Sequence, residues 1–132
     1  MRGSFNDDAS FVFEDVALDE TIGNFGLAQG TAAGDEIDRC DFALGTPASA
    51  LRLATAHVAG PYQSLAVEEQ TPSAARRDKL RADMVLIKSP TGGAVFSVGS
   101  MTWCGSLSHN RYRNSVSRIT ENVLVRFLGD VI

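Results

Sequence analysis

The C-terminal third of the chain carries the pattern that most constrains its fold. Ala94–Val98 is rich in β-branched and aromatic residues, which predicts a strand. A loop of small and polar residues around Trp103 follows this strand. The apolar residues after the loop recur at the spacing of one helical face: Val116, Ile119, Val123 and Phe127. We therefore expect a strand–loop–helix unit, with Asn114 or Ser115 capping the helix and Gly129 ending it.

The rest of the chain predicts further strands but no second firm helix. These strands are expected at Phe11–Val16, Leu51–Ala56, Ser64–Glu69 and Met84–Ile87. A turn signal at Pro90–Gly93 joins the last of them to Ala94–Val98 as a β-hairpin. A doubly wound sheet normally alternates strands with covering helices, so we expect an incomplete α/β fold, the C-terminal part of a larger unit. The polar residues 1–10 are expected to be a mobile segment, ahead of one domain formed by residues 11–132.

Composition and charge narrow the class of protein. The 132 residues carry a formal net charge of −4, with a pI of about 5.0. Nucleic-acid binding needs a basic footprint, so we expect none. The longest apolar runs are too short to cross a bilayer, and the start of the chain lacks the apolar region of a signal peptide. Cys40 and Cys104 are too few for a disulfide framework, and we expect free thiols in a cytoplasmic protein.

Several longer strings resemble one family of enzymes. They are Ala33–Arg39 with Ala43–Pro47, Tyr62–Gln63 with Val67–Glu69, Arg81–Val85, Gly92–Ser100, Trp103–Leu107 and Asn114–Asn122. In these strings, and in this order from about Phe11 to Phe127, the chain resembles the large (β) subunit of N,N-dimethylformamidase.

The resemblance implies a fold, a reaction and partners. The family hydrolyses the amide bond of N,N-dimethylformamide to dimethylamine and formate. Its large subunit ends in a domain similar to class I glutamine amidotransferases, which have a flavodoxin-like α/β fold. A small subunit accompanies the large one. The expected partners are therefore the remainder of the large subunit, a small subunit in an oligomer, and a small amide substrate.

The resemblance also implies an iron centre held by two tyrosines and a glutamate. These ligands lie upstream of the region matched here, and neither Tyr62 nor Tyr112 can be placed on a ligand position. The spacing of the cysteines and histidines does not resemble a zinc site either. We therefore expect iron in the complete enzyme, but no metal ligand and no bound iron in this chain alone.

Glu36 is the candidate catalytic residue. It lies in an acidic loop flanked by glycine, where backbone and substrate can come close. The resemblance strengthens this choice, because the family places a catalytic glutamate in its C-terminal segment. A carboxylate near an iron-bound water could act as general base or carry the proton to the leaving amine. The alternative is structural: Asp35, Glu36 and Asp38 cap the start of a helix and pair with Arg39.

Three other residues are secondary candidates. Asp35 and His57 could contact the substrate, although His57, in a loop after a strand, could also be simply exposed. Cys104 follows a strand and precedes a helix, as a nucleophile does, but the bulky Trp103 disfavours the strained turn of a nucleophile elbow. We therefore expect Cys104 to be a buried structural thiol, with the nucleophile as the alternative. Trp103 itself is expected to anchor a core or an interface.

These observations leave three functions open. The first is the C-terminal segment of an iron-dependent amidohydrolase that converts a small N-substituted amide to an amine and a carboxylate, and that is inactive without the upstream segment. The second is a non-catalytic remnant or structural module of the same family. The third is a Cys104-dependent, amidotransferase-like hydrolase.

Overall fold

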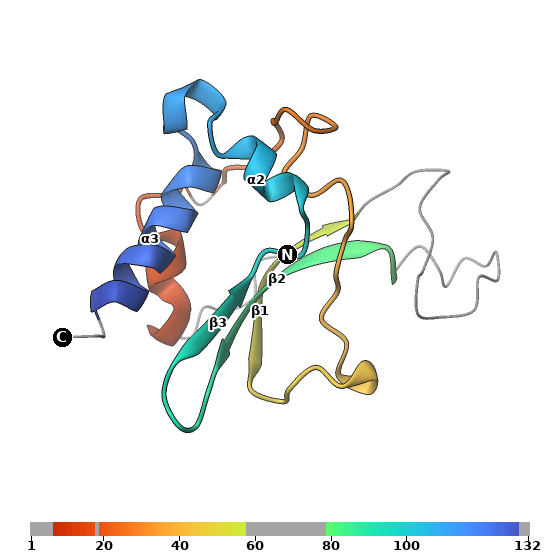
Figure 1. The fold of residues 1–132 in the computed structure, drawn as a ribbon, viewed down its shortest axis with the longest axis vertical. Helices are drawn as coiled ribbons and strands as arrows, with labels where there is room; N and C mark the ends of the chain where they lie inside the picture. Colours follow the sequence, from red (N-terminus) through yellow and green to blue (C-terminus); the bar gives the residue numbers. More distant parts are fainter. Residues whose placement is uncertain (1–6, 18, 58–78, 130–132) are drawn as a thin grey trace.

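The sheet of the protein is small, and all its described strand pairs are antiparallel. The computed structural model describes residues 7–17, 19–57 and 79–129. The strands are β1 (Ala50–His57), β2 (Arg81–Lys88) and β3 (Ala94–Ser97), in the order β1-β2-β3 (Figure 1). Both neighbouring pairs are antiparallel. The predicted hairpin is confirmed as β2–β3, and the strand predicted at Leu51–Ala56 is confirmed as β1.

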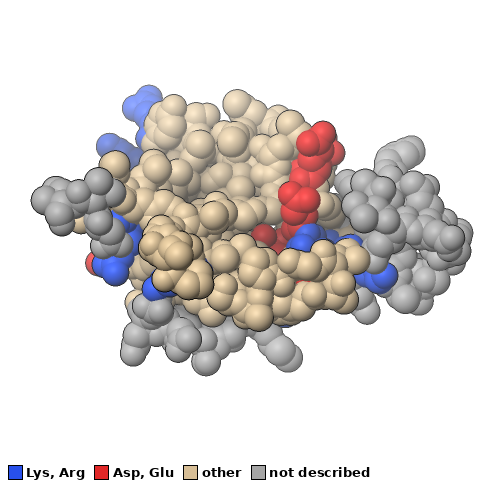
Figure 2. Space-filling model, turned by 60° about the horizontal axis from the view of Figure 1, so that its bottom comes forward, with Lys and Arg blue, Asp and Glu red and all other residues tan. Residues whose placement is uncertain are grey.

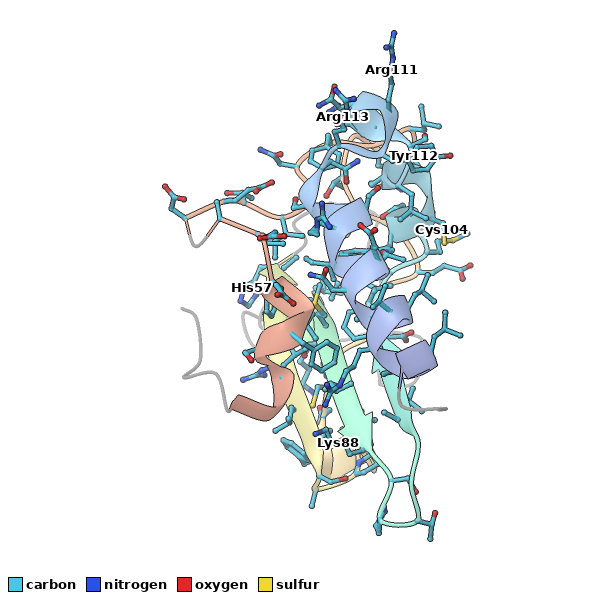
Figure 3. All side chains as sticks on the ribbon, turned by 90° about the vertical axis from the view of Figure 1, so that its left-hand side faces the viewer. His57, Lys88, Cys104, Arg111, Tyr112 and Arg113 are labelled. Atoms are coloured by element: carbon cyan, nitrogen blue, oxygen red, sulfur yellow. The ribbon has the colours of Figure 1, made fainter. Side chains whose placement is uncertain are left out.

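Two helices cover one face of this sheet. The longest is α3 (Ser115–Gly129); the shorter elements are α2 (Thr102–Ser106) and the 3₁₀ helices η1 (Asp7–Phe13), η2 (Phe42–Leu44) and η3 (His109–Tyr112). In Figure 3, η1 and α3 run side by side in front of the sheet. The predicted C-terminal helix is thus confirmed as α3. Asn114 caps it, because its side-chain oxygen accepts a hydrogen bond from the N–H of Ser117 at 2.9 Å.

The main core lies between the helices and this sheet face. Val116, Ile119 and Val123 project from α3 at the predicted helical spacing, and none is more than 5% exposed. They share one apolar cluster with Val12 of η1 and Met84 of β2. Burying a side chain of this size stabilises a fold by roughly 1.5–3 kcal/mol. The apolar stripe of α3 therefore fixes the helix on the sheet.

Strand β2 is buried on both faces. Its residues 82–86 are all buried, and Val85 packs with Cys40 and Ala50 on the face opposite Met84. The stretch that leads through η2 into β1 therefore covers the second face of the sheet. A strand enclosed in this way carries a nearly continuous apolar run in place of an alternating one.

The prediction of a strand at Phe11–Val16 is wrong. Its first residues belong to η1, in which Val12 is fully buried. The side-chain amide of Asn122 on α3 donates hydrogen bonds to the carbonyl oxygens of Val12, at 3.2 Å, and Glu14, at 2.8 Å. A helix side chain thus satisfies these carbonyls, and packing against α3 overrides the local strand pattern.

The described residues form a small α/β fold with an antiparallel sheet and a C-terminal helix. They contain none of the parallel strand pairs of a complete glutamine amidotransferase-like domain. The strand predicted at Ser64–Glu69 lies outside the described residues. No helix within those residues is both long and apolar enough to span a membrane.

Candidate functional site

The acidic loop that carries Glu36 is held at its first end by the start of α2. The N–H of Gly34 donates to the hydroxyl oxygens of Thr102, at 2.9 Å, and Ser100, at 3.3 Å. The Ser100 hydroxyl in turn donates to the carbonyl oxygen of Asp35 at 2.7 Å. Both hydroxyl residues are buried, so these bonds are shielded from water. This end of the loop is therefore fixed to the loop–helix unit after β3.

The second end of the loop is wedged between two backbone segments. The N–H of Asp38 donates to the carbonyl oxygen of Gly99, and the N–H of Asp83 donates to the carbonyl oxygen of Asp38, both at 2.9 Å. Gly99 adopts the left-handed region, with φ of 67°. This conformation suits glycine, and it turns the chain after β3 so that Asp38 fits between it and β2.

A buried carboxylate secures this second end. Asp83 is 1% exposed and accepts hydrogen bonds from the N–H of Cys40 at 2.8 Å and the hydroxyl of Thr55 at 2.6 Å. It also pairs with Arg81, whose Nε lies 2.9 Å from Oδ2. Arg81 closes the ring by donating to the carbonyl oxygen of Cys40 at 2.8 Å. Because both charged groups find partners in the network, their burial is tolerated.

Glu36 lies between the two fixed ends. It is exposed, and its backbone is in the left-handed region, with φ of 43°. Its N–H donates to the side chain of Asp35 at 3.0 Å, which supports this turn. A non-glycine residue in this conformation needs support from its surroundings, and the two fixed ends provide it. The loop therefore presents the Glu36 carboxylate to the outside on a rigid base.

The helix-capping alternative for the acidic loop is wrong. No helix begins at Asp35, Glu36 or Asp38; the next element is η2, and Asp41 caps it. Arg39 forms an ion pair with Asp41 at 2.9 Å. The hydrogen bond from Arg39 lowers the pKa of Asp41 below its ordinary value of 3.8.

A hollow of about 450 Å³ opens on the sheet face that carries Met84. Most of its walls are apolar, with Trp103 and Phe13 as the aromatic residues among those described. Glu20 is the one acidic side chain in that lining, and Ala33 connects the hollow to the acidic loop. A concave and mainly apolar space with few polar groups suits a small organic molecule.

The secondary candidates lie apart in different surroundings. His57 is exposed at the end of β1, opposite Arg81 in the register, and within the described residues it makes no hydrogen bond to Asp35 or Glu36. Cys104 is exposed within α2 and points outward (Figure 3), so the interpretation of a buried thiol is wrong. Its position inside a helix is also not the strand-to-helix turn of a nucleophile elbow.

The expectation that Trp103 anchors the core is confirmed. Trp103 is 7% exposed and belongs to the core, where its indole N–H donates to the hydroxyl of Thr120 at 3.1 Å. The ring of His109 stacks on Phe25, with 4.2 Å between the ring centroids. The turn before α3 is joined by local bonds, since the side chain of Asn110 donates to the carbonyl oxygen of Arg113.

The described residues do not form a metal site. They contain no group of three or more His, Cys, Asp or Glu side chains placed to hold one ion. Tyr112 is 67% exposed in η3, and Tyr62 lies outside the part that the structure describes. The expectation that this chain alone binds no iron stays a prediction.

Sequence reasoning missed the residues that hold the acidic loop. Asp83 interrupts the apolar run of β2, and an acidic residue inside a buried strand is a signal for a buried network. Gly99 directly follows the strand residues, which is a signal for a sharp turn. Neither signal identifies Asp38, Cys40 and Thr55 as the partners, because these contacts join distant parts of the chain.

Comparison with known proteins identifies the family. A family model described as N,N-dimethylformamidase beta subunit-like, C-terminal, matches residues 2–114. The N,N-dimethylformamidase beta subunits of Paracoccus aminophilus and Alcaligenes sp are 37% and 36% identical to the chain over 135 residues. Each match covers 98% of this chain but only 18% of the relative, so the chain spans less than a fifth of their length. The chain therefore belongs to the N,N-dimethylformamidase beta subunit-like C-terminal family.

Proposed function

We propose that the chain acts as the C-terminal domain of an amidohydrolase of the N,N-dimethylformamidase type. The observation that carries this proposal is the match of 98% of the chain to two beta subunits named for that activity. The substrate is then a small N-substituted amide, which is cleaved to an amine and a carboxylate. We also propose that the domain works in the cytoplasm, with the remainder of a large subunit and with a small subunit.

The surface supports an association with a larger polypeptide. Near its C-terminal end, α3 exposes Leu124, Val125 and Leu128 at 56%, 64% and 70%. Most of the described residues on the face shown in Figure 2 are uncharged, and most of its acidic side chains gather in one column. Large exposed apolar side chains that lie together are typical of surfaces that another protein covers. We propose that the sheet and α3 form one edge of a larger glutamine amidotransferase-like domain.

Glu36 is proposed as the proton-transfer residue of this domain. In hydrolysis the oxygen of water attacks the amide carbon, the carbon–nitrogen bond breaks, and a proton from the water reaches the departing amine. A carboxylate can take that proton and deliver it to the nitrogen. The rigid support of the Glu36 loop favours this role, because proton transfer requires a fixed donor–acceptor geometry.

The iron expected of the complete enzyme does not fit the described residues. Their acidic, histidine and cysteine side chains form no cluster that could hold it. If iron is used, its ligands come from outside the part of the chain that the structure describes. The role proposed for Glu36 is therefore confined to proton transfer, and Asp35 and His57 are kept as proposed substrate contacts.

A chimera tests the proposed function. The segment of the Paracoccus aminophilus beta subunit that matches this chain is replaced by this chain, and the product is expressed with whatever subunits that enzyme needs. We expect the chimera to hydrolyse N,N-dimethylformamide, and the same subunit without the segment to be inactive. A chimera that assembles and melts cooperatively but releases no amine would contradict the proposal.

A further inference from the structure

Three consecutive residues of η3 adopt the left-handed backbone conformation. Asn110, Arg111 and Tyr112 have φ of 50°, 56° and 64°. None is glycine, and residues with a Cβ atom visit this region as single residues and rarely in a run. Such a run persists only where the surroundings enforce it, and strained backbone of this kind concentrates at binding and switching sites.

The surroundings of η3 do enforce this conformation. The side chain of Asn114 donates to the carbonyl oxygens of His109 at 2.7 Å and Leu107 at 3.0 Å. The side chain of Asn110 donates to the carbonyl oxygen of Arg113 at 3.1 Å, and the N–H of Arg113 donates back to the carbonyl of Asn110. The stacking of His109 on Phe25 fixes the first residue of the turn to the body of the domain. These hydrogen bonds and the ring stacking therefore hold the left-handed run in one conformation.

The left-handed run exposes three side chains that make no polar or ring contact with the described part of the domain. Arg111 and Arg113 are exposed, and Tyr112 is 67% exposed. Within residues 7–17, 19–57 and 79–129, no hydrogen bond, ion pair or ring contact involves the side chain of any of the three. Figure 3 shows them at one end of the molecule, beyond α3, with Arg111 pointing away from it.

We propose that Arg111, Tyr112 and Arg113, called the η3 tip from here on, bind a carboxylate-bearing pocket on the remainder of the large subunit. Arginine and tyrosine are the residues that most often dominate the energy of protein interfaces. Arg111 and Arg113 each present an exposed guanidinium group, and guanidinium groups match carboxylates, with which they form bidentate hydrogen bonds. The inference rests on the proposed function in one respect, that the domain works with a larger polypeptide.

The length of the relatives and the net charge of this chain favour the remainder of the large subunit as the partner. In the curated relatives the segment that matches the chain is 18% of the subunit, so a far larger body accompanies it there. The chain has a net charge of −4, which disfavours nucleic acid as the partner of a two-arginine tip. In those relatives the larger body belongs to the same polypeptide, whereas a second copy is a separate chain. Three side chains bury far less than the roughly 1,200 Å² that a stable interface between separate chains needs.

The melting temperature of the isolated chain tests whether the η3 tip keeps a strained backbone while its side chains add no stability to the domain. Tyr112→Gly relieves one left-handed residue, so we expect the melting temperature to rise by about 2–5 °C. Tyr112→Ala is the matched control: it removes the same ring but keeps the strain, and it should leave the melting temperature nearly unchanged. A fall in melting temperature for Tyr112→Gly would mean that the ring stabilises the domain itself, and it would overturn the proposal.

Labelling of arginine identifies the partner. Phenylglyoxal modification of Arg111 and Arg113 is followed by mass spectrometry in the isolated chain and in the Paracoccus aminophilus chimera. We expect modification to slow at least tenfold in the chimera. Equal rates in a chimera that melts cooperatively would overturn the proposal. Protection of the isolated chain by duplex DNA, or by its own rising concentration, would assign the tip to another partner and overturn it as well. The readout does not depend on turnover, so an inactive chimera with protected arginines refutes only the proposed function.

Discussion

Gly99→Ala tests how the acidic loop is held. A Cβ atom added at Gly99 would lie 2.6 Å from the carbonyl oxygen of Asp83, 2.8 Å from its nitrogen and 2.9 Å from the carbonyl oxygen of Asp38. All three are backbone atoms, so no flexible side chain can move aside. The alanine would also have to adopt a φ of 67°, which costs about 1 kcal/mol.

The loss of stability follows from the contacts that must break. Moving Asp38 away disrupts its two backbone hydrogen bonds, with Gly99 and with Asp83. Each such bond contributes about 1 kcal/mol, and the backbone strain of the alanine adds about 1 kcal/mol. The free energy of unfolding should therefore fall by about 3 kcal/mol. For a domain of this size that corresponds to a fall in melting temperature of about 10 °C.

Gly93→Ala is the matched control for this experiment. Gly93 also lies in the left-handed region, with φ of 81°, but a Cβ atom there would meet nothing within 4 Å. It should therefore show the backbone strain alone, about 1 kcal/mol. Free energies of unfolding are measured by urea titration followed by circular dichroism. Equal losses for the two variants would refute the claim that Asp38 is wedged between β2 and the chain after β3.

Three further predictions concern charged and reactive side chains. Asp83→Asn should lower the free energy of unfolding by about 3 kcal/mol, because Arg81, whose side chain is only 16% exposed, would keep its charge without its carboxylate partner. Urea titration measures this loss, and a loss below about 1 kcal/mol would contradict the account of the pair. Asp41 has a lowered pKa in the folded chain, so its ion pair with Arg39 stabilises above the ordinary value of 3.8 and is lost as the pH falls below it. The melting temperatures of the native chain and Asp41→Asn should therefore differ at neutral pH and converge in acid, whereas a gap that widens in acid would show the opposite sign. Cys104→Ala should change the free energy of unfolding by less than about 0.5 kcal/mol, because the thiol is exposed and its removal leaves no cavity. The same variant should leave the turnover of the chimera unchanged, and loss of turnover would support the cysteine-dependent alternative.

Local patterns in the sequence predicted helix α3 and the β2–β3 hairpin. The apolar spacing of Val116, Ile119 and Val123 predicted α3 and the face it buries. The glycine-rich turn at Pro90–Gly93 predicted the β2–β3 hairpin. In both cases the information is local, because neighbouring residues along the chain decide the structure.

The failures occurred where distant contacts decide. The segment Phe11–Val16 has a strand-like composition, but the side chain of Asn122 on α3 binds its carbonyls and stabilises a 3₁₀ helix. Cys104 was expected to be buried because free cysteines usually are, whereas α2 turns this position toward solvent. The position of Glu36 in an exposed loop was predictable from its glycine-rich surroundings.

The supports of the Glu36 loop were not predictable. They are hydrogen bonds to Ser100, Thr102 and Asp83, residues more than 40 positions away in the sequence. No periodic pattern encodes such pairings, since each depends on how the sheet and α2 bring separate segments together.

The turnover of the chimera with Glu36→Gln tests the central claim most directly. Glutamine has nearly the same size as glutamate and keeps the loop, but it cannot carry the proton. Glu121→Gln, on the exposed face of α3, is the matched control for the loss of a carboxylate. The rate of dimethylamine release at saturating N,N-dimethylformamide should fall by about 10²–10⁴-fold for Glu36→Gln and stay within about twofold for Glu121→Gln. Equal rates for the two variants would contradict the claim and leave the domain a structural, non-catalytic role.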